Sequence, residues 1–162
     1  MKNGGLSTEQ WLTVALEALK DSALGSFAAE GVFVTPEDSA LAAEHSGAYV
    51  PLMAGDESMQ VGLLTSEAGC EALTRALLAM EPDEAAPGLE DVVDAVGEIV
   101  NIVAGVMQRQ LAEEGLFVEI GLPIFVEGHV VHTERHERSA ATIEIDATRA
   151  EVIMLRHNSG AA

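Results

Sequence analysis

The segment from Leu89 to Glu114 constrains the fold most, because it has the pattern of one long amphipathic helix. Large aliphatic residues recur in it every three or four positions, and a helix places residues at that spacing on one face. We expect this face to be buried; it holds Val92, Val96, Ile99, Val100, Val103, Met107 and Leu111. Gly115 comes next and is expected to end the helix. The fold must therefore supply a second layer that covers the apolar face.

Shorter elements are expected on both sides of this helix. One helix is predicted from Thr8 to Leu24, with Ser7 or Thr8 as its cap, and another from Glu67 to Met80, capped by Ser66. The β-type runs are Val32–Thr35, Ala48–Met53, Met59–Leu64, Leu116–Ile120, Ile124–Val126, Val130–Thr133, Ala141–Ile145 and Glu151–Leu155. The second and third runs are separated by residues with turn chemistry and are expected to form a hairpin.

This order of elements predicts an α/β protein built of layers, with a largely antiparallel sheet packed against long helices. The loop from Glu81 to Gly88 contains two prolines, three acidic residues and a glycine, and it is too short to link two domains. Residues 1–162 are therefore expected to form a single domain.

The composition excludes several classes of function. The chain has 27 Asp and Glu residues against 8 Lys and Arg residues, a formal net charge of −19. Binding to nucleic acid depends on Lys and Arg that displace counterions from phosphates, so it is excluded, and an anionic membrane would repel the chain in the same way. Because 48% of the residues are hydrophobic, the charge does not signal disorder. The composition predicts a folded domain whose partner is basic or carries a positive spot.

The single cysteine, Cys70, excludes a disulfide within the chain. No apolar run of the signal-peptide type follows Met1, and no apolar stretch reaches the roughly 18 residues that a membrane span needs. We therefore expect a cytoplasmic protein without membrane contact. Cys70 has no His or basic neighbour in sequence, so its thiol is expected to be buried and unreactive.

The polar face of the long helix has an unusual composition. Asp94, Glu98, Asn101, Gly105 and Gln108 fall opposite the apolar face. An Asn and a Gly weaken an exposed helix, the Gly by about 1 kcal/mol relative to Ala. Glu98 and Asn101 are neighbours on the helix surface, where a carboxylate and an amide can bind a cation and orient a water. Spacing alone also allows an ordinary solvated face, with the glycines easing helix packing.

The run from Asp94 to Gly105 resembles the signature helix of the CheX/CheC/FliY phosphatases of bacterial chemotaxis. In that family a Glu-x-x-Asn motif sits in a helix and is commonly followed by Ala-Gly, as Glu98, Asn101, Ala104 and Gly105 are here. The segments Ser66–Leu78 and Gly115–Gly128 resemble the helix before the signature and the segment after it. Because only one copy of the motif is present, the chain resembles CheX more than the two-site CheC. The resemblance implies a CheC-like fold and a single CheX-like domain.

The resemblance also implies an activity, hydrolysis of the aspartyl phosphate of a CheY-type response regulator. It implies that Glu98 forms a salt bridge to the regulator's lysine and that Asn101 places the attacking water. Asp94, Gly97, Gly105 and Gln108 are then expected to contact the partner. The Mg²⁺ belongs to the regulator, so no cofactor or metal site of its own is expected. Relatives pair through sheet edges, which implies a homodimer through the Leu116–Thr133 region.

Two alternatives remain open at the level of sequence. A non-catalytic CheC-like adaptor on the same fold would bind a chemotaxis or flagellar-switch protein without hydrolysing anything. His129, His132 and His136 have a metal-like spacing, but they follow Gly128 in a segment that has the pattern of a strand and hairpin. Because a strand places positions 129 and 132 on opposite faces, we expect a solvated hairpin there and no metal.

Overall fold

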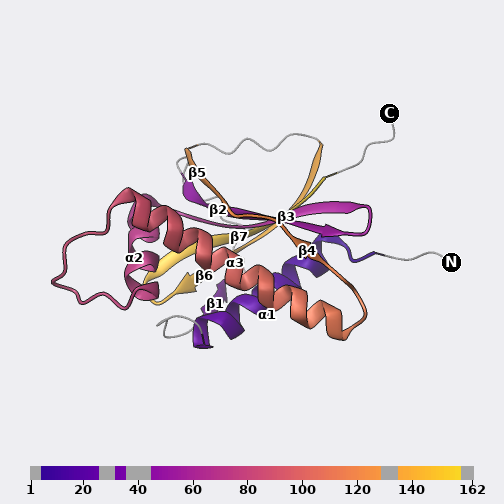
Figure 1. Ribbon diagram of the computed structural model, residues 1–162, viewed down its shortest axis with the longest axis horizontal. Coiled ribbons are helices and arrows are strands. Elements are labelled where there is room, and N and C mark those ends of the chain that lie inside the picture. The colour runs from indigo at the N-terminus through magenta and orange to yellow at the C-terminus, as the bar shows by residue number, and fades with distance from the viewer. Residues whose placement is uncertain (1–4, 26–31, 36–44, 129–134, 158–162) are drawn as a thin grey trace.

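The structure is a computed structural model that describes residues 5–25, 32–35, 45–128 and 135–157. Within these ranges it contains three helices and seven strands (Figure 1). The helices are α1 (Thr8–Gly25), α2 (Glu67–Leu77) and α3 (Leu89–Glu113). The strands are β1 (Val32–Thr35), β2 (His45–Ala54), β3 (Glu57–Thr65), β4 (Glu119–Ile120), β5 (Ile124–Gly128), β6 (His136–Ile145) and β7 (Thr148–His157). None of the helices in these ranges is long and apolar enough to cross a membrane.

One sheet joins all seven strands, and every pairing in it is antiparallel. The order is β1-β6-β7-β3-β2-β4, with β5 also paired to β2. The expected fold class, a largely antiparallel sheet against long helices, is therefore confirmed. The expected hairpin is also present, because β2 and β3 pair from Ser46–Thr65 to Ala54–Glu57.

Strand β2 carries two short strands on its outer side, which together form an interrupted edge. β5 pairs with the first half of β2, from His45 to Tyr49, whereas β4 pairs with Leu52 and Met53. Between the two, the Gly121 N–H donates a hydrogen bond of 2.9 Å to the Pro51 carbonyl. The chain therefore stays attached to β2 across the break between β4 and β5.

The helices cover one face of the sheet, and the main hydrophobic core lies between these layers. Figure 1 shows α3 crossing in front of the strands, with α1 and α2 beside it. Because strand side chains alternate, Ala48, Val50 and Leu52 of β2 all point into this core and are fully buried. Trp11 of α1 is in the same core and is only 1% exposed.

The opposite face of the sheet holds a second, smaller cluster of Tyr49, Leu64, Ile153 and Leu155. The Tyr49 ring lies over Gly62, where a Cβ would come within 2.4 Å of the ring, so only glycine fits at that position. The Tyr49 hydroxyl is buried without a hydrogen-bond partner. Burial raises the pKa of Tyr49 to about 12; nearby Arg138 lowers this pKa and Glu151 raises it. Glu151 is itself buried and forms an ion pair with Arg138.

The helices agree closely with the sequence-based expectations, and the caps explain why. The Ser7 hydroxyl accepts from the Gln10 N–H at 3.1 Å, so Ser7, rather than Thr8, caps α1. The Ser66 hydroxyl accepts from the Gly69 N–H at 3.0 Å at the start of α2. The expected end of α2 at Met80 was wrong, because regular helix stops at Leu77.

The strands differ more from the expectations. The strand expected from Leu116 to Ile120 is shorter and comprises only Glu119–Ile120. Leu116 does not join it, because its N–H is still bonded to the Leu111 carbonyl at the end of α3. The runs expected at 141–145 and 151–155 are the inner parts of two ten-residue strands, β6 and β7. The strand expected from Val130 to Thr133 lies outside the described residues.

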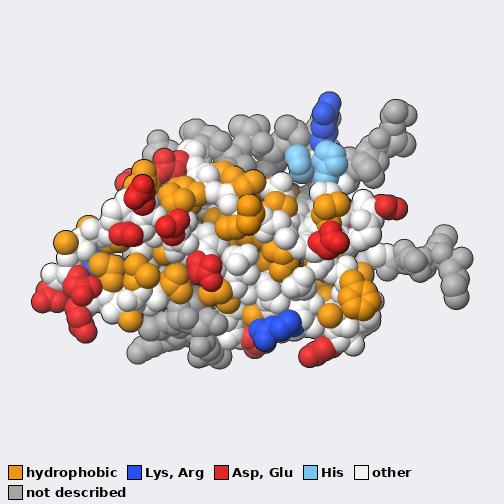
Figure 2. Space-filling model, viewed as in Figure 1, with side chains coloured by type: hydrophobic (Ala, Val, Ile, Leu, Met, Phe, Trp, Pro, Cys, Tyr) orange, Lys and Arg blue, Asp and Glu red, His pale blue; other side chains and the backbone are white. Residues whose placement is uncertain are grey.

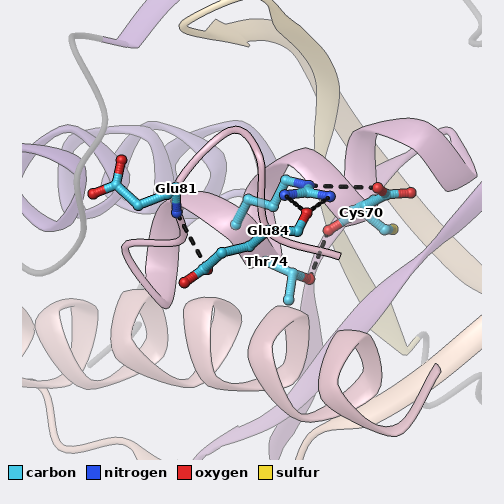
Figure 3. A network of polar contacts seen from close by, with 6 residues as sticks. Cys70, Thr74, Glu81 and Glu84 are labelled. Carbon is cyan, nitrogen blue, oxygen red and sulfur yellow. Dashed lines mark hydrogen bonds and ion pairs between the residues drawn. The ribbon is translucent and has the colours of Figure 1, made fainter. Parts of the chain in front are cut away.

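The loop between α2 and α3 is tied to α2 by polar contacts, which Figure 3 shows. The guanidinium of Arg75 donates two hydrogen bonds of 3.2 Å to the Glu84 carbonyl and forms an ion pair of 3.5 Å with Glu71. The Glu81 N–H donates to the Glu84 carboxylate at 3.2 Å. These contacts hold the acidic loop against α2, in the stretch of chain just before α3 begins.

Candidate functional site on helix α3

The long helix has the orientation that the sequence predicts. Most of its apolar face is fully buried, with exposed fractions of 0–4% for Val96, Ile99, Val100, Val103, Met107 and Leu111. Val92, at the helix start, is only half-buried. On the other side Asp94 and Glu98 are exposed, whereas Asn101 is half-buried. Packing against β2, α1 and α2 therefore holds a polar stripe outward on a rigid element.

The side chains of Glu98 and Asn101 are unengaged within the described structure. Neither forms a hydrogen bond or ion pair with another part of the chain that the structure describes. Residues three apart on a helix have Cβ atoms about 5–6 Å from each other. A carboxylate and an amide are thus presented side by side on one surface, both free to bind an outside group.

A groove runs beside this pair, between α3 and β5. Val93, Asp94, Gly97 and Glu98 of α3 line one side, and Pro123 and Phe125 line the other. The groove has a volume of about 340 Å³. Its second wall comes from a segment more than twenty residues further along the chain, so no local sequence pattern marks it.

Gly97 and Gly105 have different surroundings, although both were expected to contact the partner. Gly97 is buried, and a Cβ there would touch the ring of Pro123 at 3.4 Å, so its close contact is with its own chain. At Gly105 a Cβ would meet no heavy atom within 4 Å, so the bare backbone faces open space. Gly105 is therefore the position where another backbone can approach α3 closely.

Gln108 already has a partner within the chain. Its side-chain amide donates a hydrogen bond of 2.7 Å to the Val118 carbonyl, just before β4. This bond fixes the chain as it leaves α3. The side-chain donor of Gln108 is therefore used inside the molecule, and a contact of Gln108 with the partner stays a prediction.

The other candidate residues are Cys70 and the histidines near the end of β5. The Cys70 thiol is buried, as expected, and donates to the Ser46 carbonyl at 3.4 Å. Burial, with smaller contributions from Glu127 and Glu67, raises the pKa of Cys70 to about 11. His129 and His132 lie outside the described residues, and the ring of His136 packs edge-on against His157 at 5.4 Å. Among the residues that the structure describes, no group of three or more His, Cys, Asp or Glu is placed to hold a metal.

This geometry suits positioning rather than covalent catalysis. An amide can both donate a hydrogen bond to a water and accept one from it, with no change of protonation state. A carboxylate beside it can bind a cationic group of a partner. Both groups are on the outer side of α3 and can therefore meet a group that another molecule presents.

Solved structures of low sequence identity share the fold. The CheX protein of Vibrio vulnificus matches with a TM-score of 0.73 at 18% identity, over 94% of this chain and all of that one. A CheX–CheY–BeF₃–Mg²⁺ complex from Borrelia burgdorferi contains a chain that matches at 0.67 and 17%, over 91% of this chain and 97% of that one. The CheX protein of Desulfovibrio desulfuricans matches at 0.65 and 16%, over 90% and 97%.

No curated protein is a significant match to the sequence. A family model described as "Chemotaxis phosphatase CheX" matches residues 49–147, a span that runs from β2 to the β6–β7 turn and includes all of α3. That span is more than half of the chain and contains both Glu98 and Asn101. This protein therefore belongs to the CheX family of chemotaxis phosphatases.

Proposed function

We propose that this chain hydrolyses the aspartyl phosphate of a CheY-type response regulator in the cytoplasm. The observation that carries the proposal is the pair of Glu98 and Asn101, both unengaged within the described structure and held outward on α3, whose opposite face is buried. Membership of the CheX family supports the same reaction. The relative from Borrelia burgdorferi in complex with CheY supports the choice of partner.

In the proposed mechanism Glu98 forms a salt bridge with the lysine of the regulator's active site. This contact places Asn101 beside the acyl phosphate, where its amide orients a water in line with the bond to be broken. The water oxygen attacks phosphorus, the bond between phosphorus and the aspartyl oxygen breaks, and inorganic phosphate leaves. Catalysis then rests on positioning, which accelerates a reaction by fixing the reactants in the attack geometry.

Neither a nucleophile nor a metal of this chain takes part. The Mg²⁺ that neutralises the phosphoryl oxygens is bound by the regulator and arrives with it. Asp94 adds negative potential beside Glu98, and the bare backbone at Gly105 lets the regulator approach α3. A homodimer through the Leu116–Thr133 region stays a prediction and is not needed for this mechanism.

The substitution Asn101→Ala tests the proposal. It removes the group that orients water while leaving the Glu98 contact, so we expect kcat for phosphate release to fall at least about 100-fold, with KM changed little. Glu98→Ala should raise KM and lower kcat together. The assay follows phosphate release from a CheY-type regulator phosphorylated with a small phosphodonor.

Glu113→Gln, at the far end of α3, serves as the control and should behave like the parent. If Asn101→Ala releases phosphate as fast as the parent, the mechanism is wrong. If the parent binds the phosphorylated regulator without accelerating hydrolysis, the protein is an adaptor rather than a phosphatase.

A further inference from the structure

Basic residues are scarce in the part of the molecule that carries the candidate site. Between His45 and Gly128 the chain has fifteen Asp and Glu residues and only two arginines. One of these, Arg75, is engaged by Glu71 and the Glu84 carbonyl (Figure 3). Figure 2 shows acidic side chains interleaved with hydrophobic ones over the α2–α3 side of the face it presents, with few basic ones. This surface is suited to a partner that is both cationic and apolar.

A second pocket lies next to the α3–β5 groove. It has a volume of about 130 Å³ between α2, the start of α3 and the ends of β2 and β5. Its lining residues are Ser46, Glu67, Cys70, Glu71, Pro87, Leu89, Val92, Phe125 and Glu127. None of these is a Lys or Arg, although Glu71 is partly neutralised by Arg75.

Glu67 and Glu127 come from different elements but converge on this pocket. Glu67 begins α2, whereas Glu127 is in β5. Both carboxylates act on the Cys70 thiol at the bottom and contribute to its raised pKa. Both are exposed, and neither forms an ion pair with another described residue. They therefore offer two uncompensated charges to one cationic group.

Phe125 connects the pocket to the groove beside the catalytic pair. It lines both hollows, so the two are adjacent. The surface between them is apolar: Val92 and Val93 line it from α3, and Leu89 is 63% exposed at its entrance. The groove and the pocket thus form one continuous surface, which we call the track. It extends from Glu98, past Val93, Phe125 and Val92, to Glu67 and Glu127.

We propose that this track is a docking surface for the response regulator, separate from the contact between Glu98 and the active-site lysine. The occupant is a regulator segment that carries an apolar residue next to a second Lys or Arg. The apolar side chain lies in the α3–β5 groove against Phe125, and the cationic head group enters the pocket between Glu67 and Glu127. This inference rests on the proposed function for the identity of the partner.

Charge complementarity and continuity with the catalytic pair select this occupant. An acidic peptide would be repelled by the carboxylates of Glu67 and Glu127 in the pocket. A metal ion is disfavoured because Glu67 and Glu127 do not belong to any cluster of three or more His, Cys, Asp or Glu placed to hold one in the described part of the chain. A partner held at two points, by Glu98 and by the pocket, is fixed in orientation as well as position.

The double variant Glu67→Gln/Glu127→Gln removes both charges and keeps the volume of the side chains. We expect KM for the phosphorylated regulator to rise about five- to tenfold, with kcat changed less than about twofold, because these groups bind without touching the reacting atoms. The parent's KM should increase with salt, and that dependence should be weaker in the variant. Circular dichroism verifies that the fold is retained.

The matched control is Glu113→Gln/Glu114→Gln, which makes the same change of charge on exposed residues at the other end of α3. If both double variants have the same KM, general electrostatics explains the effect and the docking surface is refuted. If the parent does not hydrolyse the phosphate, calorimetry with a beryllofluoride-activated regulator still decides. The docking proposal is supported if the Kd for the activated regulator rises about fivefold or more, relative to the parent, only in Glu67→Gln/Glu127→Gln. It is overturned if the two double variants have equal Kd values.

Discussion

The residues proposed to act on the regulator weaken the helix that carries them. Asn101 is a mediocre helix former, and Gly105 costs about 1 kcal/mol relative to Ala in a helix interior. The opposite face compensates, because Val96, Ile99 and Val100 are completely buried against the rest of the core. Tertiary packing thus offsets the low helix propensity of Asn101 and Gly105. Such packing is the usual source of helix stability in folded proteins.

Gly105→Ala separates stability from function at this position. The added methyl group meets no atom of the chain, so we expect the free energy of unfolding to rise by about 0.4–1 kcal/mol. If the regulator packs against the bare backbone, the same change should raise KM for the phosphorylated regulator several-fold. Urea unfolding and the phosphate-release assay measure the two effects. A stabilised variant with unchanged KM would show that the partner does not approach there.

At this scale the sequence predicted only part of the candidate site. Glu98, Asn101 and Gly105 were identifiable from the helix pattern and the family resemblance, since all three belong to one local element. Pro123 and Phe125, which complete the groove, carry no signal of their own. They reach α3 only because β5 pairs with a strand about eighty residues earlier in the chain.

At the scale of elements, the C-terminal ends of α3 and α2 show when the sequence suffices to predict where a helix stops. α3 ends as expected at Gly115, whose φ of +85° is easy for glycine, and the Leu116 N–H bonds back to the Leu111 carbonyl at 2.9 Å. α2 ends in the same way with Ala79 at a φ of +50° and the Met80 N–H bonded to the Arg75 carbonyl. No glycine marks that end, so the sequence predicted a helix that was too long.

The hydrogen bond from Gln108 to the Val118 carbonyl connects the end of α3 to the approach to β4. Gln108→Ala leaves this carbonyl without its partner, and we expect the free energy of unfolding to fall by about 1 kcal/mol. Urea denaturation measures the loss. Gln110→Ala is the comparison, since that amide bonds the exposed carboxylate of Asp21 and its loss should matter less. Equal losses would mean that the Gln108 bond has no special structural role.

At the scale of the whole molecule, the sheet order follows from contacts that no local pattern contains. β1 pairs with β6, more than one hundred residues away, and β3 lies between β2 and β7. Alternation of apolar and polar residues predicts that a strand has one buried face. It does not indicate which other strand will pair with it. The layered class was therefore predictable, whereas the order of strands was not.

Two buried groups predict how the stability of the fold depends on pH. The pKa of Cys70 is raised from 9.0 to about 11 and that of Tyr49 from 10.0 to about 12, so the folded state retains both protons longer than the unfolded state. The free energy of unfolding should therefore be unaffected by these groups below pH 9 and fall as the pH rises from 9 toward 12. Urea midpoints measured across this range test the prediction.

Cys70→Ala removes the thiol that titrates first. Its urea midpoint should fall less steeply with pH between 9 and 11 than that of the parent. An identical slope in both proteins would show that the Cys70 thiol does not contribute to the alkaline loss of stability.

The burial of Trp11 has a practical consequence for studying this molecule. It is the only tryptophan in the chain, it is 1% exposed, and it belongs to α1 and the core rather than to the polar face of α3. Its fluorescence emission should therefore be blue-shifted in the native protein and report on the integrity of the core. A regulator that binds at the surface of α3 should leave this emission unchanged, so the chain contains an optical probe of folding that is insensitive to its own docking.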